Sequence, residues 1–273
     1  MTSKIPDRAS KANKTHPTAT RLIIVHGDKG GVGKSFVSEA IADFLYANKE
    51  PLLIIDADTS NPDVSRMFAT GVPCMQANLR SENGWMEVMD FVLKHPGHTV
   101  IMNTPAGVGE HMASDMKSFS EFFAAHEFPV EMELWWVMNV QHDSVNLFGK
   151  AYANYGQYFA RIRVVCNLHF ADNKKEHDGP FMLWNESPLR TRIQNNSNGM
   201  TLYFPGLHVR VVVKLFDPDN IMPFVDAIDA VAGERIGLEH SERWKLQQWR
   251  ADISAMLTPA LTRLPELNGT AAA

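Results

Sequence analysis

The chain has 273 residues, of which 45% are hydrophobic and 21% are charged, the proportions of a folded protein with room for a sizeable core. Its net charge of −5 argues against a basic field over the whole chain for binding nucleic acid, although a local basic patch is compatible with it. The two cysteines, Cys74 and Cys166, have no metal-ligand spacing and fit a reducing compartment. Because no apolar run of about 18 residues and no signal-peptide core is present, we expect a cytoplasmic protein.

The chain begins with a polar segment. Residues 1–20 include two prolines, show no hydrophobic periodicity and carry four basic residues against the single acid Asp7. We predict a flexible basic tail, a solvated leader in preference to a binding arm. One domain is expected over residues 21–258, followed by a second tail over residues 259–273.

The body of the chain alternates strand-like and helix-like segments. Apolar runs predict strands at residues 21–26, 51–56, 99–103, 131–138, 161–167 and 208–215. Helical spacing predicts helices at residues 34–48, 112–126, 143–159, 186–196, 219–232 and roughly 240–257, with Pro259 ending the last. Near-continuous apolar strands are typical of a sheet buried on both faces. The sequence therefore predicts an α/β fold, a mostly parallel, twisted sheet covered by helices on both faces.

Tryptophans allow more than one interpretation. Trp135 and Trp136 lie inside a predicted strand, which favours one buried ring on each face of the sheet over a docking role. In the terminal helix, Trp244 and Trp249 alternate with basic residues, a pattern compatible with a membrane-interface anchor. Acidic residues dilute that pattern, so we favour packing against the core.

The segment Asp28–Ser35 (DKGGVGKS) lies between a predicted strand and a predicted helix, the position of a phosphate-binding loop. Its centre consists of Gly30, Gly31, Val32 and Gly33. Glycines let backbone N–H groups surround phosphate oxygens, and the helix N-terminus adds its dipole. Lys34 would neutralise phosphate charge, and the Ser35 hydroxyl would bind Mg²⁺. These residues predict a nucleoside triphosphate site, although Asp28 replaces the first glycine of a strict Walker A motif.

The run Lys29–Ser35 resembles the deviant Walker A motif of the ParA/MinD group of ATPases, relatives of the nitrogenase iron protein. The resemblance implies a three-layer P-loop NTPase in which Lys29 reaches across a dimer interface to the partner's nucleotide. Residues 52–58 resemble the second strand and switch I of that family, which implies that Asp58 helps to organise Mg²⁺ and the attacking water. Asp63 fits the loop that senses the γ-phosphate, or equally well the cap of a following helix.

Residues 100–107 (VIMNTPAG) resemble the Walker B strand and switch II of the same family, with Asn103 in place of the expected aspartate. An amide keeps the hydrogen bonding but lacks the charge that holds Mg²⁺-bound water, so either Asp58 compensates or the protein is a slow timer or a mainly binding switch. The resemblance further implies that Asn167 reads the adenine edge and that Pro205 packs on the base.

Taken together, these segments predict an ATP-binding, ATP-hydrolysing dimeric switch with ATP and Mg²⁺ as cofactors. Lys29, Lys34 and Asp58 are its expected catalytic residues, and Ser35 and Asp58 its metal site. Family members position or partition a cargo such as plasmid DNA or conjugation machinery, which implies a nucleotide-dependent homodimer and a protein partner; a DNA or membrane surface stays open. The alternatives are a nucleotide-binding regulator with little hydrolysis and a metabolic P-loop ligase or kinase.

Overall fold

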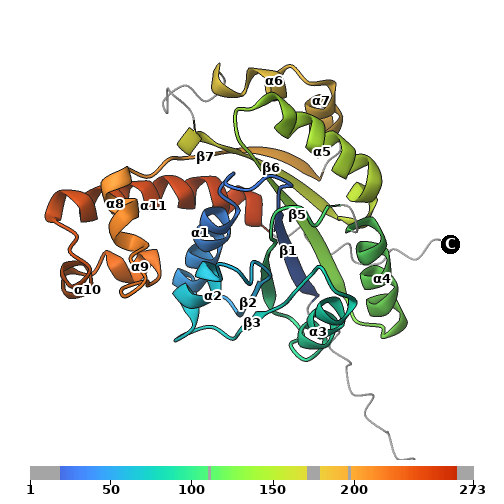
Figure 1. Ribbon diagram of the computed structural model, residues 1–273, viewed down its shortest axis with the longest axis horizontal. Coiled ribbons are helices and arrows are strands. Elements are labelled where there is room, and N and C mark those ends of the chain that lie inside the picture. Colours follow the sequence, from blue (N-terminus) through green and yellow to red (C-terminus); the bar gives the residue numbers. More distant parts are fainter. Residues whose placement is uncertain (1–18, 110–111, 171–178, 196–197, 263–273) are drawn as a thin grey trace, which may run out of the picture.

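The computed structural model describes residues 19–109, 112–170, 179–195 and 198–262 (Figure 1). Within them seven parallel strands form one sheet in the order β3-β2-β4-β1-β5-β6-β7. The strands are β1 (Thr20–His26), β2 (Leu52–Asp56), β3 (Cys74–Gln76), β4 (Thr99–Asn103), β5 (Val130–Met138), β6 (Arg161–Asn167) and β7 (Gly199–Phe204). This confirms the predicted fold class. The predicted tails lie outside the described residues, except for residues 19–20 and 259–262.

Two hydrophobic clusters, one on each face of the sheet, form the core. One face is covered by α1 (Lys34–Ala47), α2 (Asp63–Phe68), α8 (Val209–Leu215), α9 (Phe224–Ala227) and α11 (His240–Leu261). The other is covered by α3 (Glu82–Leu93), α4 (Met112–Ala125), α5 (His142–Tyr155), α6 (Met182–Asn185) and α7 (Pro188–Asn195). Because side chains alternate along a strand, Trp135 is buried in the first cluster and Trp136 in the second, as predicted.

The prediction of a strand at residues 208–215 is wrong, because this segment is helix α8. Its run of β-branched residues favours a strand, but the burial follows a helical period: Val211 and Leu215 are buried whereas Val209 and Val213 are 60% and 67% exposed. The last strand is β7, which the sequence did not predict. Strand β3 and helix α3 were also missed.

The single helix predicted at residues 219–232 is also wrong, because this region contains the two short helices α9 and α10 (Ala230–Arg235). Asp229 separates them, and its side chain accepts hydrogen bonds from the N–H groups of Val231 and Ala232 at 2.9 and 3.1 Å. Capping of this kind starts a new helix in place of continuing the old one.

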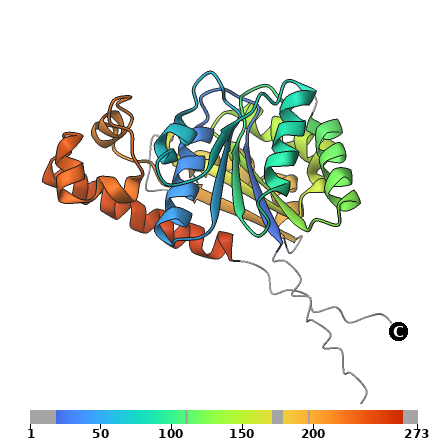
Figure 2. The ribbon, with the colours of Figure 1, turned by 90° about the horizontal axis from the view of Figure 1, so that it is seen from below.

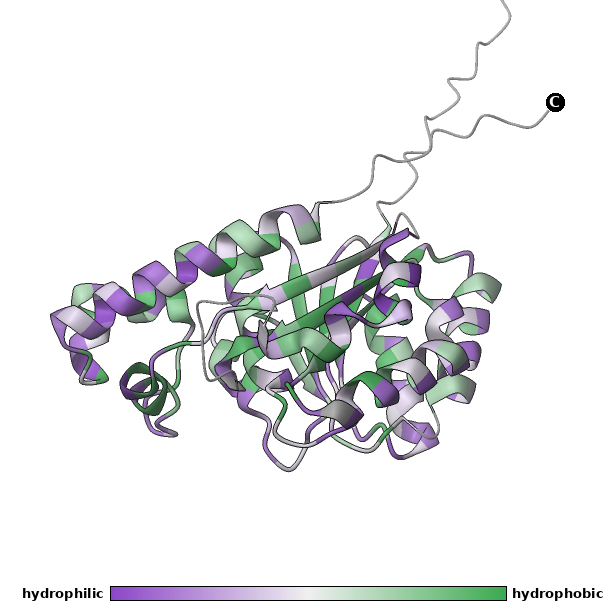
Figure 3. Ribbon diagram, turned by 90° about the horizontal axis from the view of Figure 1, so that it is seen from above, coloured by the Kyte–Doolittle hydropathy of each residue, from purple (hydrophilic) through white to green (hydrophobic). Residues whose placement is uncertain are grey.

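Helix α11 continues past Pro259 to Leu261, so the predicted end at that proline is wrong. In the last turn a proline removes only one helical hydrogen bond. The helix runs beside the sheet and projects beyond it together with α8, α9 and α10, and we call these residues, 209–261, the C-terminal lobe (Figure 2). Hydrophilic and hydrophobic residues alternate along α11 (Figure 3). None of the helices in the described parts of the chain is long and apolar enough to cross a membrane.

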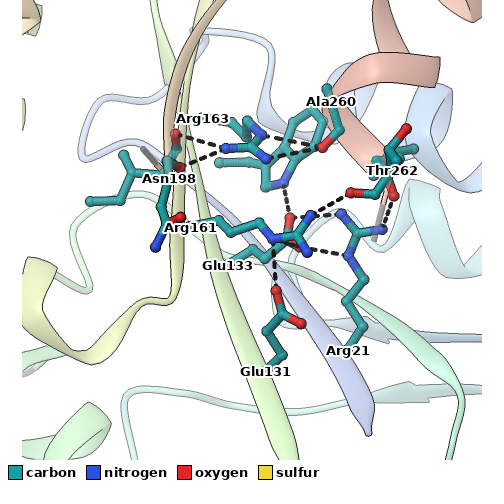
Figure 4. Close-up of polar contacts among 11 residues, drawn as sticks. Arg21, Glu131, Glu133, Arg161, Arg163, Asn198, Ala260 and Thr262 are labelled. Atoms are coloured by element: carbon teal, nitrogen blue, oxygen red, sulfur yellow. Dashed lines mark hydrogen bonds and ion pairs between the residues drawn. The ribbon is translucent and has the colours of Figure 1, made fainter. Parts of the chain in front are cut away.

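Three buried arginines hold the end of α11 against the starting ends of the strands (Figure 4). Arg21, Arg161 and Arg163 donate to the carbonyl oxygens of Leu261, Thr262 and Ala260 at 2.7, 2.7 and 3.2 Å respectively. The last carbonyls of a helix lack helical partners and carry negative partial charge, so guanidinium groups stabilise them. Glu133, fully buried, accepts hydrogen bonds from Arg21 at 2.6 and 2.9 Å.

The substitution Glu133→Gln should destabilise the protein by about 3–5 kcal/mol, because it leaves the buried charge of Arg21 without its counter-ion. Urea unfolding followed by circular dichroism measures this. Glu131→Gln is the matched control: Glu131 lies 2.7 Å from Arg161 with a side chain that is 33% exposed, and we expect its loss to cost about 1 kcal/mol or less. Equal costs for the two variants would contradict the assigned role of the buried ion pair.

Candidate nucleotide-binding site

A cavity of about 350 Å³ opens at the carboxyl ends of the strands, bordered by the loop after β1, by α1 and by α8. Of the sequence-predicted residues, it brings together Gly30, Gly31, Gly33, Lys34, Ser35, Asp58 and Asn167. Three larger cavities in the described part of the chain, of about 490, 620 and 430 Å³, lie between other elements and contain no part of the glycine-rich loop. The smaller cavity is therefore the one with the chemistry of a phosphate site.

The loop backbone has the shape that an anion needs. Gly31 and Gly33 have φ angles of 73° and 96°, in the left-handed region that favours glycine. Gly33 is the N-cap of α1, and no side chain among the described residues caps this end. The first N–H groups of the helix and its dipole are therefore directed at the cavity, which suits phosphate oxygens.

The two lysines of the loop are held differently. Lys34 is buried, and its Nζ donates to the carbonyl oxygen of Lys29 at 2.9 Å, across the loop. Burial lowers the pKa of Lys34, while Asp58 and Asp28 oppose that shift. Lys29 does not line the cavity: its Nζ lies 2.5 Å from Asp143 Oδ2 and 2.6 Å from Gln141 Oε1, at the start of α5.

Asn103 and Asp56 meet because the parallel register pairs them across β4 and β2, with Val25 of β1 in the same row. Asn103 Nδ2 lies 3.0 Å from Asp56 Oδ1 and 3.4 Å from Ser35 Oγ, and its Oδ1 accepts a hydrogen bond from Ser38 at 3.3 Å. The amide therefore bridges the predicted Mg²⁺ ligand and a fully buried acid.

Asp56 was not singled out from the sequence. It accepts further hydrogen bonds from the N–H groups of Ser65 and Asp58 at 3.0 and 3.3 Å, and these oppose the effect of burial, which raises its pKa. An acid at the end of the strand that precedes Asp58 is the signal that would have found it. Asp58 and Asp63 line the cavity beside it.

Glu39 is a second acid that sequence reasoning missed. It is fully buried on α1, lines the cavity, and neither carboxyl oxygen has a hydrogen-bond partner in the described residues. Burial, with Asp63 and Asp56 nearby, raises its pKa well above the usual 4.5. Its spacing of four residues from Ser35, which places both on one face of the helix, is the signal in the sequence.

Of the two residues expected at the base, Asn167 lines the cavity and Pro205 does not. The Asn167 side chain donates to the carbonyl oxygen of Val32 at 2.9 Å, so it supports the phosphate loop. Pro205 does not line the cavity, and its carbonyl oxygen accepts a hydrogen bond from the Trp249 indole at 2.8 Å. The apolar lining of this end consists of Phe36, Val212 and Phe216.

His26, at the end of β1, lies fully buried beneath the loop. The Thr104 hydroxyl donates to the carbonyl oxygen of Val25 at 3.0 Å, so its oxygen accepts the 2.7 Å hydrogen bond from His26 Nδ1. Nε2 then carries no proton and lies 3.6 Å from Asp28 Oδ1. Burial, with a contribution from Lys34, lowers the pKa of His26 to about 3, so the imidazole is neutral at physiological pH.

A glycine-rich loop with Lys34 and Ser35 between the first strand of a parallel sheet and its helix defines a P-loop NTPase of the ParA/MinD type. The ParA family model, described as an iron-transfer P-loop NTPase of the NUBPL kind, matches residues 18–115. Over 239 residues the chain is 30% identical to Protein MobD of Acidithiobacillus ferrooxidans, covering 88% of this chain and 97% of that protein. The chain belongs to the family of MobD.

Two solved structures show more distant similarity. A nucleotide-binding protein from Archaeoglobus fulgidus, in complex with ADP, is 16% identical with a TM-score of 0.48, over 70% of this chain and 84% of that one. A plasmid partition protein from Borrelia burgdorferi is 14% identical with a TM-score of 0.41, over 68% of this chain and 90% of that one.

The buried His26 should make stability depend on pH. Its folded pKa of about 3 lies below the usual 6.5, so the unfolded state binds more protons between these values and stability falls as pH drops through that window. We expect a loss of about 2 kcal/mol between pH 7 and pH 5 from this group. Unfolding by urea at each pH measures it. His26→Gln should flatten the acid side of the profile while His98→Gln, at a partly exposed position, should not; an unchanged profile in His26→Gln would contradict the assignment.

Proposed function

We propose that the protein is an ATP-binding, ATP-hydrolysing switch whose nucleotide state controls a homodimer. The observation that carries the proposal is the loop with two lysines, Lys34 inside the cavity and Lys29 beside it. Mg²⁺ with ATP fits the donor set: the Ser35 hydroxyl suits the metal, while Lys34 and the N–H groups of the loop suit the phosphates. When bound, the metal would neutralise charge on the phosphates.

Lys29 is free to change partners at little cost. Its ion pair with Asp143 involves side chains that are 28% and 55% exposed, and pairs at such positions contribute about 0–1 kcal/mol. A charge-assisted hydrogen bond to a phosphate of a second subunit would contribute more. This supports a lysine that stays on its own subunit in the monomer and contacts the partner's nucleotide in the dimer.

Asp58 is the residue that we propose to orient the attacking water, because it is an acid that lines the cavity. Asn103 donates its amide hydrogen to Asp56 and brings no charge of its own, which favours slow turnover. A nucleotide-binding regulator with little hydrolysis is the second candidate that this observation supports.

The proposal also covers the cargo and the surface on which the dimer sits. Similarity of the loop and switch segments to the ParA/MinD group supports a cytoplasmic dimer that positions or partitions a cargo, such as plasmid DNA or conjugation machinery, through a protein partner. Non-specific DNA and a membrane surface are separate possibilities for where the dimer sits. Binding of the ATP-loaded protein to DNA and to anionic vesicles, measured across salt concentration, distinguishes these surfaces.

Lys29→Ala should abolish ATP-dependent dimerisation. Because the proposed dimer is two-fold symmetric, the substitution removes one charged hydrogen bond from each subunit, two in total. Each contributes about 1.5–3 kcal/mol, so the dissociation constant of the dimer should rise at least about 100-fold. Light scattering after size exclusion, with ATP and with ADP, measures it. Lys150→Ala, at an exposed position on α5, is the control. If Lys29→Ala dimerised like the wild type, the two-subunit site would be excluded.

Asn103→Asp should raise the rate of phosphate release about tenfold or more, because it adds a charge one hydrogen bond from the Mg²⁺ ligand. Without Mg²⁺ the same change should lower the melting temperature, since Asp56 loses a donor and faces a second carboxyl group. Asn48→Asp, at the exposed end of α1, is the control. Unchanged turnover in Asn103→Asp would show that the amide does not limit hydrolysis.

A further inference from the structure

Glu39 is the acid in the site whose burial the rest of the fold does not account for. The residue is 0% exposed, and both carboxyl oxygens lack a hydrogen-bond partner among the described residues. Buried polar groups are nearly always hydrogen-bonded, so one that is not needs a specific reason. Because Glu39 lines the cavity one helical turn after Ser35, that reason lies in what the cavity binds.

The neighbouring acids differ from Glu39 in having donors. Asp56 accepts hydrogen bonds from Asn103 and from the N–H of Ser65, at 3.0 Å each. Asp63 is bound by Arg66 and Asn61. In the described parts of the chain no three such side chains are placed to hold a metal ion directly. Acids in this cavity can also act on a metal ion through the water molecules that the ion keeps.

Mg²⁺ in nucleotide sites binds one or two protein ligands and keeps several water molecules, whose hydrogens need acceptors. Ser35 supplies a ligand in this cavity, and Asn103 lies 3.4 Å from it but brings no charge. Glu39 lies on the same side of α1 as Ser35 and has two unused acceptor oxygens. Burial raises the pKa of Glu39 in the free protein, and the positive charge of a bound Mg²⁺ favours its ionised form. With the metal present, α1 can therefore supply the charge that β4 lacks.

We propose that Glu39 is a positioning residue of the nucleotide site: its carboxylate accepts hydrogen bonds from Mg²⁺-bound water and replaces the charge that Asn103 lacks. The inference rests on the proposed function, because it requires Mg²⁺ and a nucleotide in this cavity. The carboxylate holds water through hydrogen bonds, and no covalent bond is made or broken at Glu39. Because Glu39 acts through the metal-bound water, its loss should lower the affinity for the metal and leave the affinity for the nucleotide alone unchanged.

The test uses the full-length protein with ADP and Mn²⁺, whose electron paramagnetic resonance signal reports free metal. Glu39→Gln should weaken Mn²⁺ binding to the ADP complex about tenfold or more, the usual effect of losing such an outer contact. ADP affinity in EDTA should not change. Glu39→Met, of similar volume and without an acceptor, provides a second variant. The matched control is Asp43→Asn, one turn further along α1, where the acid is paired with Arg250 at 2.7 Å.

Two further readouts separate this role from a structural one. Without nucleotide, Glu39→Met should melt at least as high as the wild type, because it replaces an unpartnered buried acid with an apolar side chain. In an Asn103→Asp background, Glu39→Gln should weaken Mn²⁺ binding less than it does alone, because the new acid takes over its charge. Unchanged Mn²⁺ affinity in both Glu39 variants would overturn this inference but not the proposed function. A wild-type protein that binds no nucleotide, with or without metal, would overturn the proposed function as well.

Discussion

The parallel register of β1, β4 and β2 is the constraint on which the site depends. One row of paired residues across the sheet consists of Val25, Asn103 and Asp56. The phosphate loop, the segment after β4 and the buried acid are therefore at the same level of the sheet. Backbone hydrogen bonds extend this row past the strands: the Thr104 N–H donates to Val25 and the Ala57 N–H to Asn103, at 3.2 and 2.8 Å. A slip of β4 by one residue would turn Asn103 to the other face of the sheet and separate it from both Ser35 and Asp56.

A second set of contacts ties the C-terminal lobe to the same site. Phe36 follows Ser35 directly, and its ring stacks on Trp249 of α11, with centroids 5.2 Å apart and planes 17° apart. Further along α1, Asp43 is paired with Arg250 at 2.7 Å. The arginine cluster fixes the other end of α11 to the start of the strands. A shift of the first turn of α1 would therefore change how the C-terminal lobe packs. The fluorescence of Trp249 should report such a shift.

Much of this arrangement could be predicted from the sequence because its causes are local. The loop was predictable since glycine, lysine and serine requirements fall within eight consecutive positions, and the buried strands since their apolar runs leave few alternatives. Helix α8 was not, because the strand propensity of its four valines was overridden by which side chains face the core. Asp56 and Glu39 were missed for another reason: their roles follow from strand register and from a shared helix face, which no linear motif states. The resemblance implies that Asn167 reads the adenine edge; its amide donates to the carbonyl oxygen of Val32 and its side chain lines the cavity, so that role stays a prediction.

The site contains buried polar atoms that have no hydrogen-bond partner in the described part of the chain. Neither oxygen of Glu39 has a partner, nor does Nε2 of His26, while Lys34 is bonded to a carbonyl oxygen of its own loop. A buried polar group left in this state costs about 1–3 kcal/mol, and a fold that only had to be stable could remove that cost by placing apolar residues at these positions. A ligand that supplies donors to Glu39 and phosphates to Lys34 would recover part of it, so its binding would stabilise the fold in addition to filling the cavity. In a dimer built on this site, that recovered stability is available only when the nucleotide is bound, which is the physical condition for a switch.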